Sequence, residues 1–317
     1  MELDFLSDTE DTSTPDEASA LRDFVQAYNT TSALAAEETA RRLMSLNEDR
    51  VPCDGVFDKG QRIAWLLWDV GIYMPQHQVA VLVVIDAVMA LPRLDATPEQ
   101  ETRFAGKLER WRKMEDFWDI WNDTYESIGN GFPGHVRANA FMAHYLLMHP
   151  PDLCYTLELN RAIGQMMFAL ERHPWDYATA EQKATGITSP ISLRSFMVHE
   201  AHITMLNTNL HGLVPFLVIA GDIMYRYTDR EMLARRFAET HQENHQHNSR
   251  EYWQWLHTSH PSQTRLWKGD VWLTRDRWAF WKERLAWISE QSELLQRTRD
   301  EANMLVQLMK EIESREA

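Results

Sequence analysis

One stretch of the chain, residues 104–128, carries acidic side chains beside a row of aromatic rings. Its oxygen-bearing residues recur at helical spacing and include Asp119, Asn122, Asp123 and Glu126. Asp119 and Asp123 are four positions apart, so on a helix both carboxylates project from one face and could share a Mg²⁺ ion. Asn122 and Glu126 would stand near them. The spacing predicts a metal-assisted site in which the two aspartates are the principal ligands.

The same stretch places large apolar residues on the adjoining face. Those that recur every three or four positions are Phe104, Leu108, Trp111, Met114, Trp118, Trp121, Tyr125 and Ile128. At about 100° per residue this spacing makes one helical face. Trp118, Trp121 and Tyr125 would face a cationic substrate, because a ring face attracts a carbocation as it does an ammonium. The alternative is an amphipathic helix that buries its rings in the core and leaves its acids in water.

A second candidate site is the group of His199, His202 and His211, with Glu200 between the first two. Two histidines three positions apart can chelate a metal ion, although the zincin motif requires them four apart. The alternative interpretation is a solvated or hydrogen-bonded face of a helix. The sequence leaves open whether this group or the acidic row forms the site.

A third pair, Asp222 and Arg226, lies one turn apart within the apolar residues 216–227. We expect this stretch to be the most enclosed helix, because a helix that is apolar on all sides is normally buried. A buried charge must be paired, so the first expectation is an internal salt bridge between the two residues. If a cavity opens beside this helix, Arg226 could bind an anionic substrate.

The composition favours helices as the elements that position these residues. The 317 residues include 12 Gly and 12 Pro, which is few for a chain of many strands and turns, and 13 Trp. Helical periodicity recurs along the chain without convincing β alternation. We therefore predict an all-α fold: a single helical domain of about ten or eleven helices around an apolar, aromatic-rich core. Gly212 and Pro215 are expected to divide residues 191–227 into two helices.

Residues 1–15 are predicted to be a disordered acidic tail that precedes a helical domain of residues 16–317. The tail combines many acids with Ser, Thr and Pro and has little apolar surface to bury. The whole chain has a net charge of −15. Nucleic acids and anionic membranes require a basic face, so neither is expected as a partner.

Cysteine usage and apolar runs indicate a cytoplasmic protein. Cys53 and Cys154 have no spacing that suggests a metal knuckle or a redox pair, and two cysteines fit a reducing compartment. No cationic segment followed by an apolar run opens the chain. The longest apolar runs, residues 79–85 and 213–220, are too short to cross a bilayer. The oligomeric state stays open, with a homodimer as one option.

Six segments form a recognisable pattern. They are residues 65–75 before an apolar helix, Asn139-Ala-Phe-Met-Ala143, Ala169-Leu-Glu171, residues 214–225, Leu266-Trp-Lys-Gly269 and Arg277-Trp-Ala-Phe-Trp-Lys-Glu-Arg284. With this pattern, residues 61–313 resemble a large fungal family of uncharacterised helical proteins called OpdG-like. His144 departs from the pattern, because many members have Arg after the Asn-Ala-Phe segment.

The resemblance implies a role in fungal secondary metabolism. One branch of the family is the atypical class I sesquiterpene cyclases that make humulene. Those enzymes ionise farnesyl diphosphate with Mg²⁺ inside an all-helical, aromatic-lined cavity. This chain lacks the usual aspartate-rich DDxxD motif and a clear NSE motif, so the ligands of that branch do not transfer residue by residue.

The function predicted from the sequence is an atypical class I-type terpene cyclase that acts on a prenyl diphosphate, with Mg²⁺ as cofactor. Asp119 and Asp123 would hold the ion, and Arg226 would take the charge of the leaving diphosphate. One alternative is a metal-free protein of a natural-product pathway that forms a ring or binds an apolar intermediate. Another is a helical scaffold without a ligand.

Overall fold

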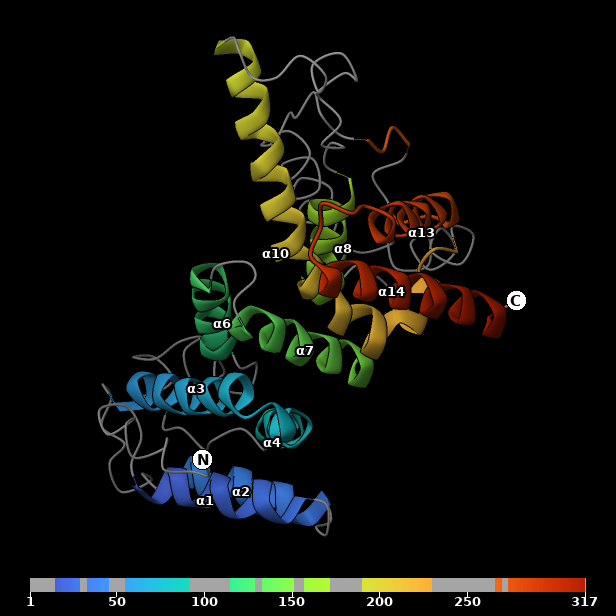
Figure 1. Cartoon of the computed structure of the whole chain (residues 1–317). Helices are drawn as coiled ribbons and strands as arrows, with labels where there is room; N and C mark the ends of the chain where they lie inside the picture. The colour runs from blue at the N-terminus through green and yellow to red at the C-terminus, as the bar shows by residue number, and fades with distance from the viewer. Residues whose placement is uncertain are drawn as a thin grey trace. The chain divides into compact units, whose positions relative to one another are not determined.

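All the regular secondary structure that is described is helical (Figure 1). The computed structural model describes residues 15–28, 33–45, 55–91, 98, 115–128, 133–150, 157–171, 190–229, 266–269 and 273–316. Within these ranges there are ten α-helices and one 3₁₀ turn, and no strand. In chain order they are α1 (Pro15–Ala27), α2 (Ala33–Ser45), α3 (Gly55–Tyr73), η4 (Pro75–His77), α4 (Gln78–Ala90), α6 (Glu115–Ser127), α7 (Pro133–Met148), α8 (Leu157–Leu170), α10 (Pro190–Arg226), α13 (Arg275–Ser289) and α14 (Gln296–Arg315). The predicted all-α fold is confirmed.

The chain divides by backbone contacts into two compact units, residues 1–129 and 130–317. Unit 1 contains α1, α2, α3, η4, α4 and α6, and unit 2 contains α7, α8, α10, α13 and α14. Each unit has its own set of buried apolar side chains. The predicted helical domain of residues 16–317 spans both units. The predicted tail, residues 1–15, lies outside the described residues except for Pro15, where α1 begins.

In unit 1, the chain turns sharply between α3 and α4 at Pro75. Proline cannot donate the backbone hydrogen bond that a continuing helix needs. The axes of residues 63–73 and 75–90 differ by 113°. Across the turn, Gln78 Nε2 donates to the Gly71 carbonyl at 2.8 Å. A buried side chain thus takes up a backbone acceptor that the end of α3 leaves unpaired.

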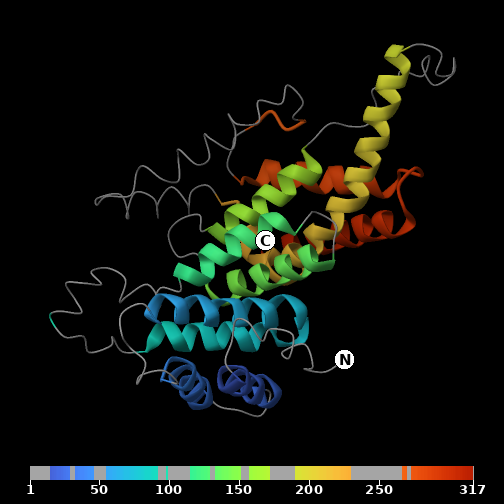
Figure 2. The same ribbon diagram turned by 90° about the vertical axis from the view of Figure 1, so that its left-hand side faces the viewer.

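The core helix of unit 1 is α4, as its apolar sequence predicts. Val81, Leu82, Val84 and Ile85 are fully buried. The helix packs against α1, α2 and α3. In Figure 2, α1 and α2 lie together on one side of α3 and α4. The apolar residues on most sides of α4 are explained by these contacts, because three helices pack against it.

In unit 2, the longest helix is α10, which packs against α7, α8 and α14. The predicted division at Gly212 and Pro215 is wrong, because the helix continues through both residues. Pro215 has no N–H to donate to the His211 carbonyl, so one backbone bond is lost. The helices packed on both sides hold the flanking turns in place, and the loss of one bond does not end the helix.

Close packing between α7 and α10 depends on Gly212. Asn139 Nδ2, on α7, donates to the Gly212 carbonyl at 2.9 Å. A Cβ added at Gly212 would lie 3.1 Å from that amide nitrogen and 3.4 Å from the His135 ring. The glycine therefore allows α7 and α10 to pack closely, and it does not break α10.

The prediction that residues 216–227 are the most enclosed helix is wrong. Phe216 is fully buried, but Val218 is 54 % exposed. Ile219 is partly exposed, and Arg226 is exposed. Three helices cover α10, and this side remains open to solvent. The apolar composition of the segment therefore overstates its burial.

Residues 203–226 of α10 form a segment that is long and apolar enough to span a bilayer. The uninterrupted apolar runs of the sequence, which are shorter, did not indicate this. The bent pair of α3 and α4 passes the same test only when the two helices are taken together. Half of the α10 segment is buried inside the protein. Its polar side chains Asn207 and His211 contact α14. Both features are those of a helix in the core of a folded unit.

A buried ion pair joins the end of α8 to the start of α13. Arg277 Nε and Nη2 donate to the two carboxylate oxygens of Glu171 at 2.6 and 2.8 Å. Trp281 Nε1 donates to the same carboxylate at 2.7 Å, and the Glu171 carbonyl accepts from the Leu266 N–H at 2.8 Å. The side chains of Arg277 and Glu171 are 0 % and 1 % exposed. Three segments of the chain therefore meet at one glutamate.

The sequence at the start of α13 places Arg277 for this contact. Thr274 is extended and its hydroxyl accepts from the Arg277 N–H, a side-chain cap that begins the helix there. Trp281 follows Arg277 by one turn, so both donors lie on one face. The cap and the helical spacing together direct the two donors to Glu171.

We expect Gly212→Ala to lower the free energy of unfolding by about 1–3 kcal/mol, the usual cost of overpacking a core. The matched control is Gly164→Ala in α8, where an added Cβ meets no atom within 4 Å. That variant should gain about 0.5–1 kcal/mol, because alanine is the better helix former. Chemical denaturation measures both changes. A similar gain in the two variants would contradict tight packing at Gly212.

We expect Glu171→Gln to lower the free energy of unfolding by about 3–5 kcal/mol, because it leaves the Arg277 charge buried without a partner. The double variant Glu171→Leu with Arg277→Met removes both charges and should recover much of the loss. Urea unfolding of the single and double variants measures the coupling. Strictly additive losses would argue against the pair as a unit.

Candidate functional site

The helix predicted for residues 104–128 is present as α6, which begins at Glu115 and ends at Ser127. Residues 104–114 lie outside the described residues. α6 belongs to unit 1, where it packs against α3. Phe117, Trp121 and Tyr125 are buried, whereas Asp119 and Asp123 are exposed. The helix is therefore amphipathic, with rings inside and acids outside.

The aromatic rings of α6 pack on one another and on α3. The Trp121 ring meets that of Trp68 edge-to-face, with centroids 4.5 Å apart, and it lies 5.7 Å from the Phe117 ring. Trp121 is fully enclosed by protein atoms, so it can meet a ligand only if its neighbours move. Trp118 is partly exposed, with its ring 6.4 Å from that of Trp121. Of the three predicted substrate-facing rings, Trp118 is the one within reach of a ligand.

The acidic row lies on the outer side of α6. Asp119 and Asp123 are both exposed and one turn apart, which brings two carboxylates to one face. The side chains of Asn122 and Glu126 lie outside the described part of the structure. Within the described residues, no three His, Cys, Asp or Glu side chains form a group that could hold a metal ion. The donors that are described are the two aspartates.

Arg226, the predicted anion anchor, lies in unit 2 at the end of α10. It is exposed and its guanidinium binds Glu316 at 2.9 Å, which raises the Arg226 pKa. Asp222 is bound instead by Arg315 at 2.7 Å. The expected internal bridge between Asp222 and Arg226 is thus replaced by two ion pairs to the end of α14. Asp222 and Arg226 are one turn apart, which suits pairing, but each binds a residue of opposite charge at the end of α14 instead.

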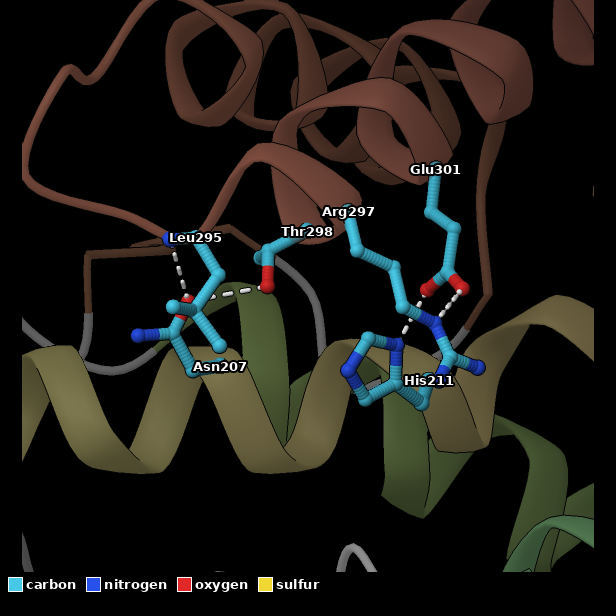
Figure 3. A network of polar contacts seen from close by, with 6 residues as sticks. All are labelled: Asn207, His211, Leu295, Arg297, Thr298 and Glu301. Carbon is cyan, nitrogen blue, oxygen red and sulfur yellow. Dashed lines mark hydrogen bonds and ion pairs between the residues drawn. The ribbon is translucent and has the colours of Figure 1, made fainter.

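The predicted histidine group lies on α10. The side chains of His199, Glu200 and His202 lie outside the described part of the structure. His211 is described, and its Nδ1 contacts a carboxylate oxygen of Glu301 on α14. Arg297 Nε donates to the other oxygen of that carboxylate at 2.8 Å. Glu301 therefore orients the His211 ring and joins α10 to α14 (Figure 3).

A second polar contact lies one turn earlier on both helices. Asn207 Oδ1 accepts from the Leu295 N–H at 3.0 Å and from the Thr298 hydroxyl at 2.8 Å (Figure 3). Leu295 has no side-chain oxygen to cap α14, so an amide from another helix takes over part of that role. Sequence reasoning missed Asn207, Glu301 and Thr298. The available signal was the four-residue spacing of Asn207 and His211, but their partners are about ninety residues away.

Two titratable side chains, the half-buried Asp69 and the buried His135, have strongly shifted pKa values. Burial raises the pKa of Asp69 on α3 to about 6 and lowers the pKa of His135 on α7 to about 4. In both cases the fold favours the neutral form, because removing a charge from water is costly. The two residues belong to different units, and the His135 ring lies beside Gly212.

A family model described as a protein of unknown function, DUF3632, matches residues 68–285. This range covers more than half of the chain. The chain belongs to the DUF3632 family. No curated protein and no solved structure matches it.

The DUF3632 match includes some of the clusters described above and only part of others. It contains α6 and both sides of the pair between Glu171 and Arg277. It ends at residue 285, before Arg297 and Glu301 on α14. The family region thus contains a complete buried ion pair, whereas the His211 contact joins it to a helix beyond the match.

The shifted pKa values predict two opposite effects of pH on stability. Between pH 4 and 6.5 the unfolded chain protonates His135 and the folded protein does not, so this residue lowers stability as pH falls, by up to about 3 kcal/mol. Between pH 3.8 and 6 the folded protein keeps a proton on Asp69, so that residue lowers stability as pH rises.

Unfolding of His135→Gln and Asp69→Asn at several pH values separates the two effects. Relative to the parent protein, His135→Gln should gain stability as pH falls from 6.5 to 4. Asp69→Asn should gain stability relative to the parent as pH rises from 3.8 to 6. Differences that do not change with pH would contradict the burial of these charges.

Proposed function

We propose that this DUF3632 protein is an atypical class I-type terpene cyclase that acts on a prenyl diphosphate in fungal secondary metabolism. The observation that carries the proposal is the exposed pair of Asp119 and Asp123, one turn apart on a helix whose other side is an aromatic cluster. The resemblance of the sequence to the OpdG-like family supports the same class of reaction.

The donors of α6 suit Mg²⁺, which prefers oxygen ligands and is commonly held by one or two carboxylates while it keeps several waters. Asp119 and Asp123 would hold the ion, with Asn122 and Glu126 as further candidates. When bound, Mg²⁺ supplies positive charge that offsets the charge of a departing diphosphate. Trp118, partly exposed beside these acids, would face the cationic chain. Trp121 and Tyr125 would support Trp118 from the core.

Arg226, the anion anchor predicted from the sequence, belongs to unit 2 and is not part of the site proposed on α6. It would bind an anion only by exchanging its present partner. Its guanidinium is exposed, so a diphosphate can reach it without a buried path. The Glu316 carboxylate already binds it, however, and an incoming anion must displace that carboxylate. An exposed ion pair is weak, typically below about 1 kcal/mol, so the exchange costs little.

A second candidate function is a metal-free protein that holds an apolar, anionic intermediate of a natural-product pathway. The buried guanidinium of Arg284, which lies over the ring of Trp287, favours it. A helical scaffold without a ligand is the third candidate, and the packed rings around Trp121 suit it.

Incubation of the purified protein with farnesyl and geranylgeranyl diphosphates, with and without Mg²⁺, tests the proposal. A cyclase releases terpene products that gas chromatography detects, and only when Mg²⁺ is present. Asp119→Asn and Asp123→Asn should each lower turnover by about 10²-fold or more, because each removes a charge from the shell of the ion. Their melting temperatures should stay near that of the parent, since both residues are exposed.

Three variants serve as controls for the aspartate variants. Glu38→Gln removes an exposed carboxylate from α2 and should leave turnover unchanged. His199→Gln and His202→Gln test the competing histidine site. If that site is the catalytic one, these two variants lose activity and the aspartate variants keep it. A parent protein that makes no terpene and binds no diphosphate would end the cyclase proposal.

A further inference from the structure

A guanidinium on α13 is buried without a counter-charge among the described residues. Arg284 is 8 % exposed, and its Nε and Nη2 atoms are shielded from solvent and have no hydrogen-bond partner in the part of the chain that the structure describes. Its guanidinium carbon lies 3.8 Å from the centroid of the Trp287 ring. The ring face stabilises the positive charge but accepts no in-plane hydrogen bond. The planar edge of this guanidinium therefore retains its full capacity to donate.

The same helix shows how such an edge is satisfied. Arg277 precedes Arg284 by seven residues, close to two full helical turns, so both project from nearly the same side of α13. Arg277 uses Nε and Nη2 to bind the two oxygens of the Glu171 carboxylate. These are the two atoms that Arg284 leaves unpaired. Each arginine also has a tryptophan nearby, Trp281 for Arg277 and Trp287 for Arg284.

The charge on Arg284 persists at neutral pH. Burial lowers its pKa to about 10, which is still well above 7. A buried cation is stable only when an anion and hydrogen-bond acceptors accompany it. The ligand-free arrangement is thus penalised, and an anion bound at the guanidinium would remove the penalty.

We propose that Arg284 is the anion-binding group of an unassigned site in unit 2, where its Nε and Nη2 edge takes the phosphate or carboxylate of a small molecule. The fork of a guanidinium matches two oxygens of either group, as the contact between Arg277 and Glu171 illustrates. The inference deepens the second candidate function, the holding of an apolar, anionic intermediate. It needs neither Mg²⁺ nor the acids of α6.

Isothermal titration of the full chain without Mg²⁺ tests the site. The probes are inorganic phosphate, inorganic pyrophosphate and octanoate, which separate a phosphate site from a carboxylate site. The parent should bind at least one probe, and Arg284→Met should weaken that binding at least tenfold. The matched control, Arg315→Met, removes an exposed arginine of the same unit and should leave binding unchanged. A parent that binds no probe, or an Arg284→Met variant that binds as the parent does, overturns the proposal.

Thermal unfolding gives a second readout that a purely structural arginine would not produce. Without a ligand, Arg284→Met should melt at a higher temperature than the parent, because it removes an unpaired buried charge. The bound probe should raise the melting temperature of the parent and not that of the variant. Arg284→Lys keeps the positive charge but lacks the forked guanidinium, so it should bind the probe more weakly than the parent. This variant supplies the test if Arg284→Met does not fold. A lower melting temperature for Arg284→Met with no effect of any probe on the parent counts against the site.

These outcomes are separable from those of the cyclase test. Anion binding that depends on Arg284 in a protein without cyclase activity supports this site and the metal-free function. In a parent protein that makes terpenes, probe binding that Arg284→Met does not weaken overturns the Arg284 site and leaves the cyclase proposal intact.

Discussion

The ion pair between Glu171 and Arg277 is the constraint on which the arrangement of α8 and α13 depends. Glu171 accepts two bonds from Arg277 and one from Trp281, so its carboxylate is well satisfied although it is buried. Neither charge can be removed alone without leaving the other in a medium of low dielectric constant. The backbone carbonyl of Glu171 also accepts from the Leu266 N–H at the end of α8. One glutamate thus joins three segments that are distant in sequence, α13 through its carboxylate and Leu266 through its carbonyl.

Unit 1 is held by apolar contacts. The rings of Trp68, Phe117 and Trp121 pack edge-to-face or tilted between α3 and α6, an arrangement that their charge distribution favours. Asp119 and Asp123 lie on the solvent side, because a charged carboxylate is costly to bury. This separation bears directly on function. If α6 is catalytic, its chemistry takes place on the solvent side, where Asp119 and Asp123 lie near the partly exposed Trp118.

Two arginines of α13, Arg277 and Arg284, illustrate how identical side chains acquire different roles. Arg277 has a permanent counter-ion supplied by the chain itself and contributes to the fold. Arg284 has the same donor edge and a similar degree of burial but binds no acid among the described residues. An arginine of the second kind is either a cost to stability or a place for an anion from outside. Stabilisation of the protein by an anion that depends on Arg284 distinguishes the second role from the first.

Much of the local structure could be predicted from the sequence. The helical class, the core helix α4 and the aromatic face of α6 all depend on the spacing of apolar residues within a single helix. That spacing is a local property, because a helix repeats every 3.6 residues wherever it lies. The row containing Asp119 and Asp123 was predicted to share a face for the same reason, and the two residues do.

The choice of partners was decided by the tertiary structure. Asp222 and Arg226 suited each other along the helix, but α14 brings Arg315 and Glu316 closer to them. Gly212 was predicted to break the helix. Its role is instead to allow the close approach of α7, which no local pattern encodes. The sequence by itself determined the helical class and which faces of the helices are apolar, since both follow from neighbours within a few residues. The partners of Glu171, Asp222 and Arg226 were decided only by folding, because each of these residues pairs with one about ninety or more positions away.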